Sequence, residues 1–166
     1  MNTTTMSQTA ARPAGLGRLP ALTTASLSSL ASPFALATRL YVSWQFLKSG
    51  FLKISSWETT LSLFRDEYHV PLLPPGLAAV VGTFGELFFP VLVIAGLFGR
   101  LSALGLFAVN AMAVISYRHV LLTEGFEAAL GQHVLWGFML LTLAIYGPGK
   151  WSADYALRRR LGSDIW

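Results

Sequence analysis

Residues 77–98 read LAAVVGTFGELFFPVLVIAGLF, and Glu86 is the only charged side chain among them. A stretch of 22 such residues is long enough to cross a bilayer as an α-helix. An ionised side chain at the centre of a membrane helix costs about 2.5–3.5 kcal/mol on insertion scales, so such groups usually face a protein interior and have a function. The sequence therefore predicts a membrane helix here, with Glu86 as a candidate site residue.

The composition of the whole chain agrees with a membrane protein. Of its 166 residues, 54% are hydrophobic and 12% are charged, whereas a soluble domain has about 25% charged residues. The mean hydropathy is +0.56. The absence of cysteine excludes a disulfide framework and a dithiol relay within this chain. The lipid bilayer is the expected partner, and the net charge of +4 gives no reason to expect nucleic acid.

Four membrane spans are predicted, so the expected fold is an all-α polytopic four-helix bundle. The spans are residues 34–54, 77–98, 101–117 and 132–146, and the last is short unless it extends back into 126–131. Pro33 and Pro148 occupy positions where helices commonly start and stop. Residues 57–68 are expected to form a short interfacial helix.

The chain divides into three expected parts. Residues 1–32 are rich in Ser, Thr and Ala, and they indicate a disordered cytoplasmic tail, with an organellar transit peptide as the alternative. Residues 33–150 form the membrane domain, and residues 151–166 form a basic cytoplasmic tail. Basic residues in short loops mark the cytoplasmic side. They collect on the side of both termini, at Arg12, Arg18, Arg100, Lys150, Arg158, Arg159 and Arg160.

Glu86 has two candidate basic partners in the first span. Arg39 and Lys53 are fourteen residues apart, which places them within about 40° of each other around a helix. Glu86, Lys53 and Arg39 are therefore the candidate catalytic set, with a purely structural ion pair as the alternative. Either basic side chain could instead extend to the membrane interface.

Other polar side chains lie within the predicted spans. Gln45 and Lys48 share a second face of the first span, and Asn110 lies in the middle of the third. His133 begins the fourth span, and His119 follows the third. For Asn110 the alternative to a functional role is an interhelical hydrogen bond, and for Lys48 it is extension of the side chain to the membrane interface. No metal-ligand spacing is present, so no metal site is predicted.

Three patterns in chain order resemble the DoxX family. They are R-L-x5-F-L-x2-G-x2-K-I at 39–54, G-x2-G-E-L-x2-P-x5-G-L-x2-R at 82–100, and G-P-G-K-W-S-A-D at 147–154. The resemblance implies a small four-helix protein of the bacterial inner membrane that is associated with redox systems. The related DoxD protein is a subunit of a thiosulfate:quinone oxidoreductase. The matching positions are Arg39, Gly50, Lys53, Glu86, Pro90, Arg100 and Asp154.

Three functions remain open at this point. The first is a redox-associated membrane subunit, in which an apolar cleft holds a quinone and Glu86 with a basic partner contacts its carbonyls or relays protons. Gln45, Lys48, Asn110 and His133 are the candidate cofactor contacts in this case. The second is a membrane anchor or assembly subunit without chemistry of its own, and the third is a small metabolite or metal carrier. Other protein subunits or further copies of the chain are expected partners. Whether the chain is part of an enzyme is undecided.

Overall fold

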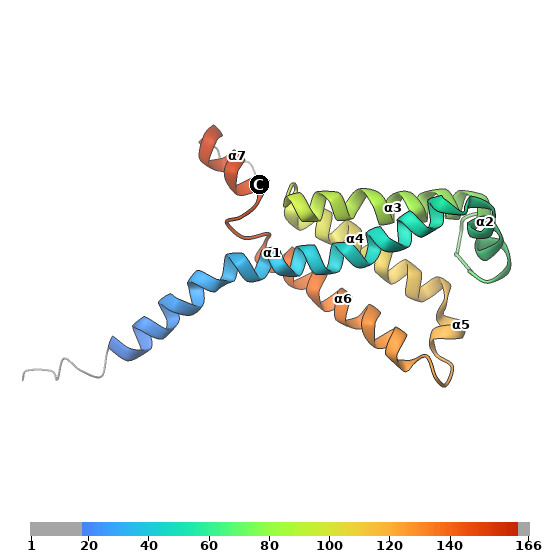
Figure 1. The fold of residues 1–166 in the computed structure, drawn as a ribbon, viewed down its shortest axis with the longest axis horizontal. Coiled ribbons are helices and arrows are strands. Elements are labelled where there is room, and N and C mark those ends of the chain that lie inside the picture. The colour runs from blue at the N-terminus through green and yellow to red at the C-terminus, as the bar shows by residue number, and fades with distance from the viewer. Residues whose placement is uncertain (1–17, 163–166) are drawn as a thin grey trace, which may run out of the picture. The chain divides into compact units, whose positions relative to one another are not determined.

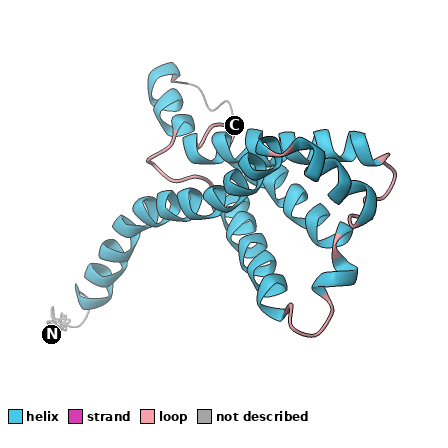
Figure 2. Ribbon diagram, turned by 45° about the vertical axis from the view of Figure 1, so that its right-hand side comes forward, coloured by secondary structure: helices cyan, strands magenta, loops and turns pink. Residues whose placement is uncertain are grey.

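The computed structural model describes residues 18–162, with side chains from Leu27 onward, and every regular element among them is a helix (Figures 1 and 2). The long helices are α1 (Arg18–Ser55), α3 (Pro75–Ala95), α4 (Gly99–Ser116) and α6 (Glu127–Tyr146). The shorter helices are α2 (Trp57–Asp66), α5 (Arg118–Leu121) and α7 (Ala153–Leu161). The protein is thus an all-α membrane protein with several hydrophobic helices.

Three helices of the described part are long and apolar enough to cross a membrane, namely α3, α4 and α6. Their bounds agree with the predicted spans to within a few residues, and α6 includes the expected extension before Gln132. Large apolar side chains lie exposed on all three helices, including Phe84 of α3, Leu101 of α4 and Phe138 of α6. Such exposed apolar surface is consistent with contact with the lipid bilayer.

The fourth predicted span lies within α1, which is not among these three helices. Its 34–54 segment carries Arg39, Lys48 and Lys53, and so it is too polar to be identified by hydropathy alone. Arg39 and Lys53 are nevertheless buried by the protein itself, with 1% and 8% of their surfaces exposed. These two charges therefore do not face the lipid.

The expected start of the first helix is wrong. Pro33 lies inside α1, which begins fifteen residues earlier at Arg18, so residues 18–32 are helical although we expected a disordered tail. A proline lacks one backbone donor but tolerates helical φ, so it does not always start a helix. Residues 1–17 of the predicted tail, and residues 163–166 of the predicted C-terminal tail, lie outside the described residues.

The chain divides into two units within α1, at Ala31 and Ser32. In the second unit, α4 packs against α3 on one side and α6 on the other, and α2 packs against α3 (Figure 1). The core joins α1, α3, α4 and α6. Its buried residues are Val42, Phe46, Val93, Ala103, Leu106, Leu140 and Leu143.

Candidate functional site

Glu86 of α3 and Lys53 of α1 form a buried ion pair. The Lys53 Nζ lies 2.7 Å from Glu86 Oε2 and 2.8 Å from Oε1. It also donates to Ser49 Oγ, one helical turn earlier, at 2.7 Å. An ammonium group has three donors, and these three acceptors are enough to satisfy it. The expected approach of Glu86 to a basic residue of the first helix is therefore present, with Lys53 as its partner.

A glycine brings the two helices close enough for this pair. A Cβ added at Gly50 would lie 2.7 Å from Leu87 Cδ2 and 3.3 Å from Glu86 Cβ. Any larger residue at position 50 would push α1 away from α3 where the salt bridge forms. Thr60 of α2 closes the same end of α1, because its hydroxyl donates to the Lys53 carbonyl at 2.9 Å.

Arg39 does not join Glu86. Fourteen residues of helix separate Arg39 from Lys53 by about 21 Å along the axis, so one carboxylate cannot contact both side chains. The Arg39 Nη1 donates to the Ile94 carbonyl at 3.0 Å, and Nη2 donates to the Trp151 carbonyl. Arg39 therefore ties α1 to the end of α3 and to the segment before α7.

Asp154 completes this second polar centre. Its carboxylate accepts hydrogen bonds from the backbone N–H groups of Phe98, at 2.9 Å, and Gly99, at 2.7 Å. These are donors that the start of α4 leaves without partners inside the helix. Gly96 ends α3 at a φ of 64°, which favours glycine, and its carbonyl accepts from the Asp154 N–H at 3.1 Å. These contacts join the turn between α3 and α4 to the start of α7.

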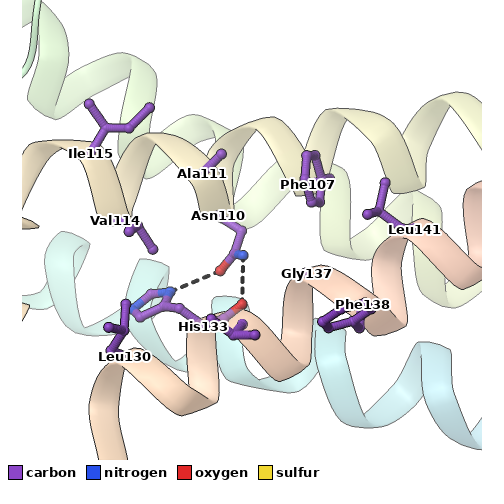
Figure 3. A pocket seen from close by; sticks show the side chains of 11 residues that line it. Phe107, Asn110, Ala111, Val114, Ile115, Leu130, His133, Gly137, Phe138 and Leu141 are labelled. Atoms are coloured by element: carbon purple, nitrogen blue, oxygen red, sulfur yellow. Dashed lines mark hydrogen bonds between the residues drawn. The ribbon is translucent and has the colours of Figure 1, made fainter. Parts of the chain in front are cut away.

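Asn110 of α4 and His133 of α6 form two hydrogen bonds between their helices (Figure 3). The Asn110 Nδ2 donates to the His133 carbonyl at 2.9 Å, which leaves Asn110 Oδ1 facing His133 Nδ1 at 2.8 Å. An amide oxygen only accepts hydrogen bonds. The His133 Nδ1 therefore carries the proton, and in the neutral ring Nε2 is an acceptor.

These two residues lie on an apolar groove of about 320 Å³ between α4 and α6. Figure 3 shows the groove with the hydrogen-bonded pair at its centre. The other lining residues are Phe107, Ala111, Val114, Ile115, Leu130, Val134, Gly137, Phe138 and Leu141. The groove therefore combines apolar walls with one polar position.

Gln45 and Lys48, the other two expected cofactor contacts, do not line this groove. The Gln45 Nε2 turns back to the carbonyl of Tyr41 at 3.4 Å, and Lys48 is exposed. Lys53 and Glu86 do not line it either. The structure thus separates the ion pair from the groove, whereas we expected a carboxylate and its basic partner to contact a ligand in one cleft.

A cluster of aromatic rings beside α2 was not predicted. The Phe64 ring contacts the Tyr68 ring, with centroids 4.9 Å apart, and the Tyr68 ring contacts the Tyr117 ring, with centroids 5.1 Å apart. Burial, followed by the negative charge of Glu86, raises the pKa of Tyr68 to about 12. The tyrosines belong to different loops, so no helical periodicity in the sequence connects them.

Comparisons with known proteins identify relatives of this chain and its family. It is 27% identical to an uncharacterized protein of Haemophilus influenzae over 137 residues, which are 79% of this chain and 87% of the relative. No solved structure matches the chain. The family model that matches residues 34–119, just over half of the chain, is DoxX. This protein is therefore a member of the DoxX family.

Proposed function

We propose that this protein is a redox-associated subunit of the bacterial inner membrane that holds a quinone-class ligand in the groove between α4 and α6. One observation carries the proposal: a groove with apolar walls has Asn110 and His133 at its centre. Ligand sites for small molecules commonly combine apolar walls with few polar groups. A quinone has the matching chemistry, since its ring bears two oxygens and its tail is a hydrocarbon.

The hydrogen bond to Asn110 favours the reduced form of such a ligand. Because Nδ1 carries the proton, the neutral His133 ring offers Nε2 as an acceptor. A quinol hydroxyl can donate to Nε2, whereas a quinone carbonyl cannot. The redox group that exchanges electrons with the quinol would belong to a partner subunit. The absence of cysteine means that a dithiol in this chain is not that group.

In this proposal, the ligand is not contacted by Lys53, Glu86 or Arg39. Lys53 and Glu86 hold α1 against α3, and the buried carboxylate remains a candidate proton-handling group. Arg39 is assigned a structural role at the joint that it forms with the end of α3 and the segment before α7.

The test is the quinone content of protein purified in mild detergent. Extraction and chromatography should recover close to one quinone per wild-type chain, and His133→Phe and Asn110→Leu should each reduce that amount at least tenfold. Lys48→Gln is the matched control, since it changes an exposed polar residue outside the groove. If wild-type protein contains no quinone and does not bind an added short-chain quinol, this function is wrong.

A membrane anchor for a soluble partner is the second candidate, and α7 favours it. Arg158, Arg159 and Arg160 are all exposed on this helix, and they form a basic surface suited to an acidic partner. Chemical crosslinking in intact cells, compared between wild type and the triple Arg→Gln variant, tests this candidate. A soluble protein crosslinked to wild type and lost from the variant would support it.

A further inference from the structure

Two histidines from distant parts of the chain meet beside the aromatic cluster. His69 lies in the loop after α2, and His119 lies in α5, fifty residues later. Their ring centroids are 4.5 Å apart, and the ring planes are inclined by 36°. Both side chains are exposed. No helical or strand spacing predicts this contact, because it depends on how the loop returns to α4.

Contacts outside the two imidazoles hold them in place. The backbone N–H of His69 donates to the Ser116 carbonyl at 3.0 Å, which fixes the loop to the end of α4. The Tyr117 ring lies edge-on to His119 with centroids 5.6 Å apart. The Tyr117 hydroxyl donates to Glu67 Oε2 at 3.1 Å. These contacts fix the backbone at His69 and pack Tyr117 against the His119 ring, so they favour the observed spacing of the pair.

We propose that His69 and His119 form an open binding site for a divalent transition ion of the Zn²⁺, Cu²⁺ or Ni²⁺ class. Imidazole nitrogen is a preferred ligand of these ions. With metal–nitrogen bonds of about 2.0–2.1 Å, two imidazoles bound at 90–110° have centroids about 4.5–5.2 Å apart. The observed 4.5 Å is at the lower limit of that range, which corresponds to an angle of about 90° at the metal.

The site would have two protein ligands, with water in the remaining positions. The described residues contain no group of three or more His, Cys, Asp or Glu side chains suited to a metal. Structural zinc sites use four protein ligands and are closed, so this site would instead be accessible and exchangeable. Glu67 accepts the hydrogen bond from Tyr117, which packs against His119, so its carboxylate adds a negative charge to the surroundings of the site. The site is separate from the groove, so it does not depend on the proposed quinone function.

The sequence allows a clean test, because the chain has only three histidines and no cysteine. Protein purified with a tag that lacks histidine would be titrated with Zn²⁺ by isothermal calorimetry in detergent. We expect one Zn²⁺ per wild-type chain, and at least tenfold weaker binding for His69→Asn and for His119→Asn. His133→Asn is the matched control and should bind Zn²⁺ as wild type does.

Three results would overturn the site. They are the absence of saturable binding to wild-type protein, undiminished binding by the His69→Asn/His119→Asn double variant, and a stoichiometry of one Zn²⁺ per two chains. The last result would indicate a site between copies. Both substitutions are at exposed positions, so unchanged thermal unfolding of the variants should show that lost binding is not lost folding.

Discussion

At the scale of single residues, the ion pair shows how a lysine can be buried in a membrane protein. The Lys53 Nζ donates to both carboxylate oxygens of Glu86 and to Ser49 Oγ, so the ammonium group needs no water to satisfy its donors. Removing one partner from a buried ion pair is costly, because the other charge stays buried without a partner of opposite charge. The same hydrogen bonds that make the pair tolerable therefore make it sensitive to substitution.

We expect Glu86→Gln to fold but to have a free energy of unfolding lower by up to about 3–5 kcal/mol. The amide keeps one acceptor for Lys53, but the negative charge is lost. Thermal unfolding in detergent measures the change. Lys48→Gln is the control, and it should stay within about 0.5 kcal/mol of wild type because Lys48 is exposed. Equal stability of Glu86→Gln and wild type would show that the pair contributes nothing net.

Tyr68 gives a pH dependence with a definite sign. Its pKa rises from 10.0 to about 12 in the folded protein, mainly through burial. The folded state therefore holds the phenol proton more tightly than the unfolded state does. This contribution to stability is complete below about pH 10 and disappears as the pH rises to about 12.

The measurement is the unfolding temperature of wild type and Tyr68→Phe between pH 9 and 12. The difference between the two proteins isolates Tyr68 from the lysines, which titrate in the same range. Wild type should lose more stability than Tyr68→Phe across this interval. Parallel curves for the two proteins would contradict the raised pKa.

At the scale of elements, glycines decide how closely the helices approach. Gly50 lies against Leu87 and Glu86, whereas a Cβ added at Gly131 of α6 would have no atom within 4 Å. We expect Gly50→Ala to destabilise the protein by about 1–3 kcal/mol through overpacking. Gly131→Ala should be neutral or stabilising by up to about 1 kcal/mol, because alanine favours the helix.

Thermal unfolding of the two variants side by side tests this contrast, since each adds the same methyl group to a helix. The Lys53–Glu86 pair should also weaken in Gly50→Ala, because the added methyl group forces α1 away from α3. If Gly50→Ala is as stable as wild type, Leu87 moves aside at little cost and the close approach is not required.

The sequence predicted elements better than contacts between them. Membrane helices need long apolar runs whose backbone is satisfied internally, so α3, α4 and α6 were located closely. Helical periodicity places Arg39 and Lys53 on one face of the first span, so the sequence left two candidate partners for Glu86. The choice between them depends on how far along the axis of α1 Glu86 lies, and the sequence does not give that position. The carbonyl of Trp151, which binds Arg39, lies 112 residues away, and no local pattern indicates so distant a partner.

The start of α1 and the histidine pair were missed for different reasons. Pro33 has a φ that suits both the first turn and the interior of a helix, so its position alone did not define where α1 begins. The contact of His69 with His119 depends on the loop after α2 returning to Ser116. The sequence of such a loop has no hydrophobic period, and the path of the loop depends on its tertiary contacts, which the sequence alone does not reveal.

At the scale of the whole molecule, the number of membrane spans depends on whether α1 crosses the bilayer. Three helices are apolar enough to span it, and an odd number of spans would place the two ends of the membrane domain on opposite sides. The 34–54 segment of α1 is the proposed fourth span. Two of its three basic side chains, Arg39 and Lys53, are buried against the protein, and only Lys48 is exposed.

We therefore expect both termini in the cytoplasm. The basic residues Arg100, Lys150 and Arg158–Arg160 gather at the α3–α4 turn and around α7, as the positive-inside rule requires of the cytoplasmic side. Green fluorescent protein fused after Gly149 should fluoresce, and alkaline phosphatase fused there should be inactive. Phosphatase fused after Ser56, beyond the proposed span, should be active. An inactive phosphatase at Ser56 would mean that α1 does not cross the membrane, and its buried charges would then serve only to attach it to α3.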